Sequence, residues 1–315
     1  GGYGASLLSG IADLMYVLDG ATWDVADPNS VNAFQWVYSA YEPFIYKGNL
    51  MDMVRGREMS RYGIQDDDAA VSVLSSIIRL SSVAPPADAL AFKSMIKGWL
   101  ASDVDKTFLS AAPVDLIVSA KSILDDVSVT PREELVSNRQ FTGIDRTVHL
   151  RPGFGFGISM ASSRIGAFES INSENNKGWH TGDGMTYLYN DDLSQFHDDF
   201  WPTVDSYRLP GTTVLKNTTQ TPNTRTDKSW VGGASIQGQY GVTGMELHPI
   251  GRNLEGKKSW FMFDDEVVAL GAGITSTDGI DTETIVENRK LNDAGDNTLT
   301  VDGATCEEAC ARKLF

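Results

Sequence analysis

Three arginines, Arg55, Arg57 and Arg61, lie close together in one stretch of the chain. If this stretch is helical, Arg57 and Arg61 are one turn apart and project from the same face. Two guanidiniums placed in this way could grip a carboxylate or stabilise an oxyanion through charge-assisted hydrogen bonds. The same spacing also fits a solvated face paired with Glu58 and neighbouring acids. On spacing alone, both interpretations stay open.

A second group of residues that could do chemistry lies in a stretch punctuated by glycines, residues 172–185. It contains amides, an acid, a tryptophan and a histidine: Asn172, Glu174, Asn175, Trp179 and His180. Amides beside tryptophan are typical of sugar recognition, because hydroxyls need paired donors and acceptors and ring faces need an apolar platform. A structural loop held by Asx turns would use the same residues. The stretch predicts either a carbohydrate-binding loop or a structural turn.

Common catalytic motifs are absent from the sequence. It has no Gly-x-Ser-x-Gly, no phosphate loop, no His-Glu-x-x-His and no paired Cys-x-x-Cys. The glycine-rich run 152–157 superficially resembles a nucleotide-binding loop. It lies among expected strands rather than before a helix, so we interpret it as a close-packed strand. Hydrolysis by a familiar serine or zinc route therefore has no support.

The overall charge narrows the choice of partner. A formal net charge of −16 disfavours a general nucleic-acid or anionic-membrane binder. An acidic protein can still bind a polyanion if its basic groups gather in one cleft. The sequence has no run of about 18 apolar residues, the length a membrane-spanning helix needs. We therefore expect neither a nucleic acid nor a membrane as partner.

The chain termini and cysteines add two smaller expectations. The sequence starts with Gly1 and has neither an initiator methionine nor a signal-peptide pattern, so we expect a mature or cleaved chain. Its two cysteines, Cys306 and Cys310, lie in a stretch that could be helical. They define no disulfide framework.

The elements that must position these residues change character along the chain. From about residue 5 to residue 127, apolar residues recur at helical spacing. Examples are Ile11, Leu14, Met15 and Leu18, then Phe34, Val37, Tyr38 and Tyr41, then Phe92, Met95, Ile96 and Trp99. Breaks fall at glycines and prolines, with Asp66 and Asp88 as candidate caps. We predict five or six helices, packed as antiparallel pairs in a bundle or a ring.

After about Pro131 the chain reads as a β-domain. Alternating, β-branched or aromatic runs are separated by Gly, Asn and Asp. Expected strands cover residues 147–150, 154–160, 185–189, 259–263, 266–270 and 282–286. The stretch 216–229, rich in Thr and Asn, is expected to be a long exposed loop.

Several of these motifs closely resemble polysaccharide lyase family 8, which includes hyaluronate lyase, chondroitin AC lyase and xanthan lyase. The resemblance covers almost the whole chain, and its longest match is residues 172–190. Further matches are Gly1-Gly2-Tyr3-Gly4, Arg55-Gly56-Arg57 with Ser60-Arg61, Arg151-Pro152-Gly153-Phe154, residues 200–204, 208–213, 258–261 and 264–266, and Val286-Glu287-Asn288-Arg289. Matches of this length and order are highly specific.

The resemblance implies an α+β multidomain fold. In this family an incomplete (α/α) toroid is followed by a large antiparallel β-sandwich, or supersandwich, and the cleft lies between them. We therefore expect the C-terminal part of the toroid at residues 1–130 and an incomplete β-sandwich at residues 131–315. This division agrees with the change from helical to strand patterning.

The resemblance also assigns roles to individual residues. The family's catalytic tyrosine maps to Tyr3, and its active-site arginines map to Arg57 and Arg61. The family's β-domain loop brings a carboxylate and an amide into the cleft, which by motif position implies Glu174 and Asn175, with Asn172 beside them. Trp179 completes the expected substrate-binding residues.

One departure from the family pattern concerns residues before Gly1. The family's catalytic histidine and asparagine both lie upstream of the tyrosine, so this chain lacks them. His180 does not replace that histidine, because it belongs to the β-domain motif. We expect the chain to be a middle segment whose partner is the remainder of the same enzyme, including upstream helices that carry the histidine and the asparagine.

The reaction implied by the resemblance is β-elimination at a uronic acid. Tyr3 would remove the proton at C5 and then return a proton to the oxygen leaving C4. An ordinary phenol has a pKa of about 10, so phenolate needs a nearby cation, for which Arg57 is the candidate. Arg61 would hold the substrate or orient Glu174. Neither a redox cofactor nor a catalytic metal is needed.

The expected substrate is an acidic polysaccharide of the hyaluronan or chondroitin type, cut by a secreted, extracellular enzyme. Xanthan lyase activity within the same family is one alternative. Another is a non-catalytic carbohydrate-binding fragment, in which the sugar-recognising loop persists while chemistry is lost.

Overall fold

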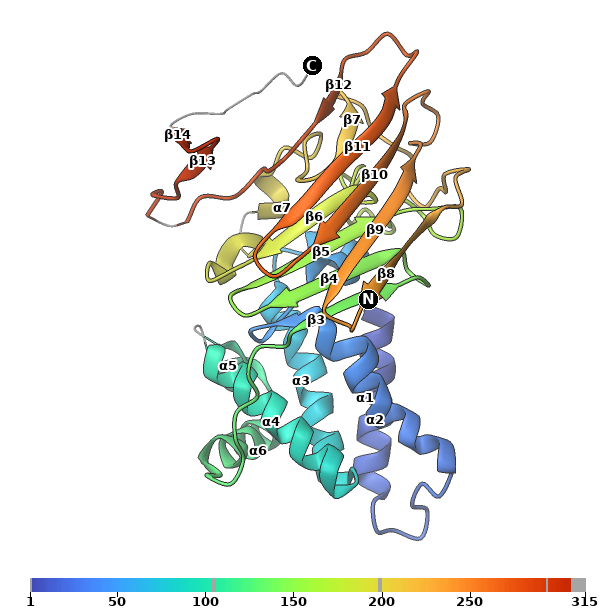
Figure 1. Cartoon of the computed structure of the whole chain (residues 1–315). Coiled ribbons are helices and arrows are strands. Elements are labelled where there is room, and N and C mark those ends of the chain that lie inside the picture. The colour runs from blue at the N-terminus through green and yellow to red at the C-terminus, as the bar shows by residue number, and fades with distance from the viewer. Residues whose placement is uncertain (1, 104–105, 198–199, 293, 307–315) are drawn as a thin grey trace.

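The computed structural model describes residues 2–103, 106–197, 200–292 and 294–306. Helices occupy one end of the molecule and antiparallel sheets the other (Figure 1). The α+β architecture expected from the sequence, helices followed by a β-sandwich, is confirmed.

The described residues before β3 contain six α-helices, within the predicted number. They are α1 (Gly2–Leu18), α2 (Val31–Trp36), α3 (Asp66–Val83), α4 (Pro86–Ser102), α5 (Thr107–Ala111) and α6 (Val114–Asp125). A capping box between Gln65 and Asp68 begins α3, because each side chain accepts a hydrogen bond from the other residue's backbone N–H. The expectation that Asp66 caps this helix is wrong, since Asp66 is its first helical residue.

Short turns replace the helix considered for the arginine-rich stretch. The segment between α2 and α3 contains η2 (Val37–Tyr41), η3 (Glu42–Phe44), β1 (Ile45–Tyr46), β2 (Asn49–Leu50), η4 (Asp52–Val54) and η5 (Gly56–Ser60), and η1 (Pro28–Ser30) precedes α2. Arg57 lies in η5, a 3₁₀ turn, and Arg61 follows it in extended conformation. The two arginines are therefore not neighbours on an α-helix.

Two four-stranded antiparallel sheets form the β-half. The first has the order β3 (Ser137–Phe141), β4 (Arg146–Arg151), β5 (Phe154–Met160), β6 (Asp183–Tyr189). The second has the order β11 (Val267–Thr275), β10 (Glu255–Met262), β9 (Tyr240–Leu247), β8 (Val231–Ile236). Two smaller sheets pair β7 (Thr213–Leu215) with β12 (Thr282–Thr284) and β13 (Leu299–Val301) with β14 (Ala304–Cys306). Between the large sheets in sequence lie η6 (Leu193–Phe196) and α7 (Phe200–Thr203).

Two sequence expectations for this half need correction. The stretch 216–229 has no regular structure, as predicted, but Thr218, Gln220 and Thr226 within it are buried. Cys306 ends strand β14 rather than lying in a helix. Cys310 lies outside the described residues.

The first sheet contributes to two hydrophobic cores. One face presents Val148, Leu150 and Tyr187 to the helices, within a core that includes Leu8, Ile77 and Phe92. The opposite face presents Ile158 and Met160 to Met245 and Trp260 of the second sheet. This sheet is consequently the shared wall between the two halves.

Glycines in β5 let the arginine-bearing segment approach this wall closely. A Cβ at Gly157 would lie 2.7 Å from Sδ of Met53 in η4. The interpretation of the glycine-rich run as a close-packed strand is confirmed from Phe154 onward, while residues 152–153 form a turn.

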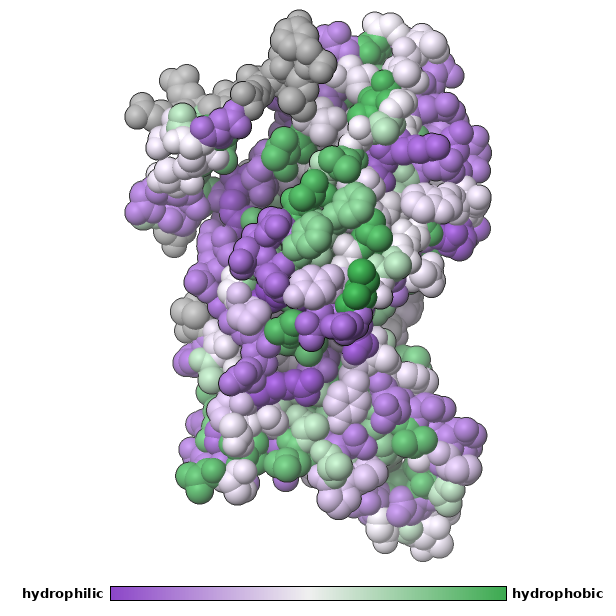
Figure 2. Space-filling model, in the orientation of Figure 1, coloured by the Kyte–Doolittle hydropathy of each residue, from purple (hydrophilic) through white to green (hydrophobic). Residues whose placement is uncertain are grey.

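The second sheet presents apolar side chains on its outer face. Figure 2 shows them gathered over this sheet, where Phe261, Val268 and Leu270 are exposed. Among the described residues, no helix combines the length and apolar character needed to cross a bilayer.

Candidate active site

Arg57 occupies the point where the helical half meets the loop between β5 and β6. Gly56 places it there with φ of +61°, a conformation that favours glycine. A side chain at Gly56 would collide with the carboxylate of Glu169. The positive φ and this side-chain contact together favour a glycine before Arg57.

Three partners hold the Arg57 guanidinium. Its NH1 donates to Oε1 of Glu169 at 2.7 Å, and its Nε donates to Oε2 of Glu174 at 2.8 Å. The backbone N–H of Arg57 also donates to Oε2 of Glu169 at 3.1 Å. The third partner is Tyr3 near the start of α1, and this hydrogen bond is the largest cause that raises the pKa of Arg57. Tyr3, Arg57 and Glu174 therefore come together from three separate segments.

Arg61 shares the same carboxylate from the other side. Its Nε lies 2.6 Å from Oε1 of Glu174, its NH2 lies 3.1 Å from Oε2, and its NH1 lies 3.1 Å from Oε1 of Glu58. The hydrogen bonds of Arg61 and then Arg57 lower the pKa of Glu174. The hydrogen bond to Glu174 in turn raises the pKa of Arg61. Glu174 therefore stays ionised and fixes both guanidiniums.

Internal hydrogen bonds shape the loop that carries Glu174. Asn172, Ser173 and Asn175 all have positive φ, which Asn tolerates better than most residues. Asn175 is buried, and its Nδ2 donates to the carbonyl oxygen of Glu169 at 2.9 Å. Its backbone N–H donates to Oγ of Ser60 at 2.8 Å, which ties the loop to η5. The loop backbone is therefore a structural turn. The Glu174 side chain points out of this turn and accepts hydrogen bonds from Arg57 and Arg61.

A cavity of about 300 Å³ opens beside these residues, between the helical half and the loop. Its wall includes Arg61, Tyr62, Asn175, Asn176, Lys177 and Trp201. Tyr62 is 74% exposed, and Tyr3 is 82% exposed. Basic, amide and aromatic groups thus line open space next to the half-buried arginines of the cluster.

Other residues highlighted by the sequence lie elsewhere. Arg55 is buried in an ion pair with Asp52, at 2.5 Å between NH1 and Oδ1, so it supports η4 and η5 from inside. Asn172 is exposed at the tip of the loop. Trp179 packs against Tyr207, with 4.9 Å between ring centroids, and against a small core that includes Phe168. These contacts hold the Trp179 ring against the β-half.

His180 is a buried residue of the loop's interior. Its Nδ1 lies 2.9 Å from Oδ2 of Asp183, and its Nε2 lies 2.8 Å from the carbonyl oxygen of Thr218. Burial disfavours the charged ring, but the hydrogen bond and charge of Asp183 outweigh this and raise the pKa of His180. These contacts agree with leaving His180 out of the catalytic residues.

Sequence reasoning missed Glu169, Ser60 and Tyr62. Glu169 precedes the polar stretch, and the only available signal was a second acid in the same loop as Glu174. Ser60 and Tyr62 are the sequence neighbours of Arg61, and this adjacency was the only signal that could have pointed to them. No spacing rule singles them out.

Comparisons with known proteins agree with the fold. A family model described as polysaccharide lyase family 8, super-sandwich domain, matches residues 136–313. A second, described as polysaccharide lyase family 8, N terminal alpha-helical domain, matches residues 1–98.

Individual relatives cover the chain almost completely. A xanthan lyase of Bacillus sp. (strain GL1) is 52% identical over 96% of this chain and 33% of its own length. A hyaluronate lyase of Thermasporomyces composti is 38% identical over 96% of this chain and 40% of its own length. The chain thus spans between a third and two fifths of these relatives.

Solved structures give the same result. The structure of a Paenibacillus xanthan lyase has a TM-score of 0.94 and 68% identity, covering 96% of this chain and 29% of that one. The chondroitin AC lyase of Streptomyces coelicolor A3, solved in complex with chondroitin sulphate, has a TM-score of 0.88 and 37% identity, covering 95% and 43%.

Proposed function

Since this chain belongs to polysaccharide lyase family 8, we propose that it forms the catalytic cleft of an enzyme that cuts acidic polysaccharides by β-elimination. The polymer would be cleaved at a uronic acid and would leave an unsaturated uronic acid at the new non-reducing end. The helical domain and the super-sandwich domain supply opposite walls of the cleft. We place the boundary between them near residue 130.

The meeting of Tyr3, Arg57 and Glu174 supports this proposal most directly. Elimination next to a carboxylate needs a base for a weakly acidic proton and positive charge near that base. Arg57 is hydrogen-bonded to the Tyr3 phenol and to Glu174. A guanidinium in this position supplies positive charge beside the base, and two acidic partners restrict its movement.

In the proposed reaction the Tyr3 phenolate takes the C5 proton of the uronic acid. The electron pair of the C5–H bond forms the C4–C5 double bond, and the C4–O bond breaks. The phenol formed at Tyr3 then donates its proton to the departing oxygen. Arg61 binds the substrate or orients Glu174, while Asn172, Asn175 and Trp179 contribute to sugar binding. Upstream helices of the same enzyme supply the histidine and the asparagine that neutralises the uronate.

The proposed substrate is a hyaluronan- or chondroitin-type polymer, as the relatives named hyaluronate lyase and chondroitin AC lyase suggest. Xanthan is a second candidate, favoured by the 52% and 68% identity to proteins named xanthan lyases. We propose that the enzyme acts outside the cell, where such polymers occur.

The test is to incubate the protein separately with hyaluronan, chondroitin sulfate and xanthan and to record ultraviolet absorbance from the new double bond. A rise with at least one polymer is the expected outcome, and the responding polymer identifies the substrate class. A flat trace with all three polymers, together with retained sugar binding, would instead favour a carbohydrate-binding fragment.

Tyr3→Phe is the matched variant for this assay, because it removes only the phenolic oxygen. We expect kcat to fall below detection while the affinity for the polymer stays nearly unchanged, since a base is lost but the binding surface is retained. Affinity can be measured by calorimetry with the inactive variant. Substantial turnover by Tyr3→Phe would contradict the role assigned to the phenol.

A further inference from the structure

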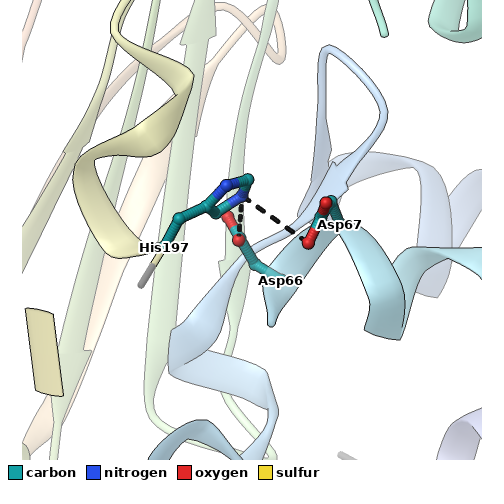
Figure 3. A group of neighbouring side chains, drawn as sticks. All are labelled: Asp66, Asp67 and His197. Atoms are coloured by element: carbon teal, nitrogen blue, oxygen red, sulfur yellow. Dashed lines mark ion pairs between the residues drawn. The ribbon is translucent and has the colours of Figure 1, made fainter. Parts of the chain in front are cut away.

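A second group of charged side chains links the two halves outside the cluster around Arg57. Asp66 and Asp67 are the first two residues of α3 in the helical half, and His197 directly follows η6 in the β-half. Figure 3 shows the imidazole of His197 pointing toward both carboxylates. The group therefore bridges parts of the chain that are far apart in sequence.

The donor atoms of this group lie close enough to share one ion. One atom from each side chain, the imidazole nitrogen or a carboxylate oxygen, lies within 4.8 Å of the others. His197 Nε2 forms an ion pair with Oδ1 of Asp66 and lies 3.8 Å from Oδ1 of Asp67. Nδ2 of Asn49 lies 3.3 Å from the same imidazole nitrogen. Three donors and a neighbouring amide thus surround one point.

Asp66 is the residue that most needs a further partner. It is 1% exposed, and apart from the His197 ion pair neither carboxylate oxygen has a hydrogen-bond partner in the described part of the chain. A buried carboxylate without donors is costly unless a charge compensates it. The nearby Arg55 is already paired with Asp52 at 2.5 Å. Two acids therefore face one imidazole, and the group is short of positive charge.

We propose that Asp66, Asp67 and His197 form a binding site for a divalent transition-metal ion of the zinc type. An imidazole nitrogen combined with two carboxylates is a donor set that suits Zn²⁺, whereas Ca²⁺ and Mg²⁺ prefer oxygen ligands throughout. Rotation of the Asn49 amide would offer its oxygen as a fourth ligand. The structure thus supplies the ligand number that a tetrahedral site requires.

The surroundings of Asp67 fit this assignment. Oδ2 of Asp67 accepts a hydrogen bond from Oγ1 of Thr107 at 2.7 Å, which leaves Oδ1 turned toward His197. Hydrogen bonds of this kind orient carboxylates that bind metals. Asn49, Asp67 and Thr107 also line a cavity of about 10 Å³, close to the space that a single water molecule occupies. A small ion could reach Asp67 from this side.

The ion would act as a structural clamp and would take no part in the elimination. It would join the start of α3 to the segment after η6 and so hold the helical half against the β-half. The same three side chains could instead form an ion pair with a protonated imidazole, which needs no metal. The two arrangements differ in whether zinc binds with a defined stoichiometry.

The experiment treats the purified protein with a chelator, removes the chelator and titrates with Zn²⁺ by calorimetry. We expect one zinc ion per chain, and we expect Asp67→Asn and His197→Gln to weaken binding by about 100-fold or more. His248→Gln is the matched control, because His248 also pairs with an acid, Asp227, at 2.5 Å but is not part of this group. Its zinc affinity should equal that of the wild type.

A second readout follows thermal unfolding with and without Zn²⁺. Bound zinc should raise the Tm of the wild type and of His248→Gln but not of His197→Gln. Asp67→Asn keeps the test decisive if His197→Gln fails to fold, since the Asp67 side chain is 17% exposed and less critical for packing. Zinc binding that is absent from the wild type, unchanged in the Asp67 variant or displaced by equimolar Ca²⁺ would overturn the proposal. None of these outcomes depends on lyase activity.

Discussion

The Arg57 side chain contacts both halves of the cleft. Its hydrogen bond to Tyr3 reaches the helical half, and its hydrogen bonds to Glu169 and Glu174 reach the β-half. A guanidinium can make these contacts together because its donors form a rigid planar fork. A lysine could not reproduce this geometry with one point charge.

Arg57→Ala should lower kcat/KM by about 100-fold or more. The substitution removes the positive charge that Arg57 places beside the base and the reacting uronate. The measurement is kcat/KM with the polymer that responds in the absorbance assay. Arg208→Ala is the control, since Arg208 is held by Glu283 of β12 at 2.6 and 2.8 Å. If Arg57→Ala keeps the kcat/KM of the wild type, the assigned role is wrong.

Glu169→Gln tests a positioning residue that the sequence did not reveal. The substitution keeps the side-chain size but removes the charge that holds NH1 of Arg57 at 2.7 Å. We expect kcat to fall by about tenfold with little change in Tm, because orientation is affected more than packing. Glu283→Gln, which loosens Arg208 in the same way, should leave kcat unchanged. A lower Tm with normal kcat would show that Glu169 is only structural.

The sequence indicated the main residues of the site but not all of their partners. Family resemblance singled out Tyr3, Arg57, Arg61 and Glu174, and the structure brings them together. Glu169 could not be found from the sequence, because its contact with Arg57 depends on how two distant segments pack. The sequence also did not predict that the Trp179 ring packs against Tyr207. A residue's type alone does not say which neighbour it meets.

Among the elements, α4 shows how a glycine inside a helix can be required by packing. Gly98 lies in its interior, where alanine would ordinarily be favoured by about 1 kcal/mol. A Cβ there would lie 2.5 Å from the backbone oxygen of Arg132, in the segment leading to β3. The backbone of that segment cannot move aside as a side-chain end could. Helix propensity and packing therefore oppose each other at this position.

Gly98→Ala should consequently lower the free energy of unfolding by about 1–3 kcal/mol, the usual cost of overpacking. Gly10 of α1 provides the opposite case, because a Cβ there would meet no atom within 4 Å. Gly10→Ala should therefore stabilise the chain by up to about 1 kcal/mol. Urea unfolding of both variants measures the difference. Equal effects of the two substitutions would argue against the contact at Arg132.

Periodicity predicted the helices and most strands because these elements bury one face over several turns or residues. It failed for η4 and η5, whose turns depend on the buried ion pair between Asp52 and Arg55. It also failed to predict burial in the stretch 216–229. There the carbonyl oxygen of Thr218 lies 2.8 Å from Nε2 of His180, and Nε2 of Gln220 donates to Oδ2 of Asp183 at 2.6 Å. Polar contacts with distant residues draw a polar loop inward, and composition cannot reveal them.

Across the whole molecule, Lys258 links stability to pH. It lies buried on β10, where its Nζ donates to the carbonyl oxygens of Asp183 and Gly211. Burial lowers the pKa of Lys258 to about 7. A lysine in an unfolded chain has a pKa of about 10.4, so between about pH 7 and pH 10 only the unfolded chain binds this proton. Stability from this residue therefore rises with pH across that window and is lowest below it.

Lys258→Met should remove this rise. Relative to the variant, the wild type should gain about 2 to 3 kcal/mol in the free energy of unfolding between about pH 7 and pH 9. Chemical unfolding of the wild type and the variant at pH 7 and pH 9 gives this difference. Titratable groups that the two proteins share contribute equally and cancel. A difference that is independent of pH would mean that the buried amine keeps its proton throughout.

The close fit of Met53 against Gly157 has a consequence for how this protein can be recombined. The two residues belong to opposite halves, and a larger residue in β5 would occupy the place of the methionine sulfur. A chimera that took its helices from one homologue and its sheets from another should pack best if Met53 and Gly157 come from the same homologue. Exchanges between homologues are therefore better designed around the contact surface between the two halves. A crossover placed only at the linker would separate residues that pack against each other.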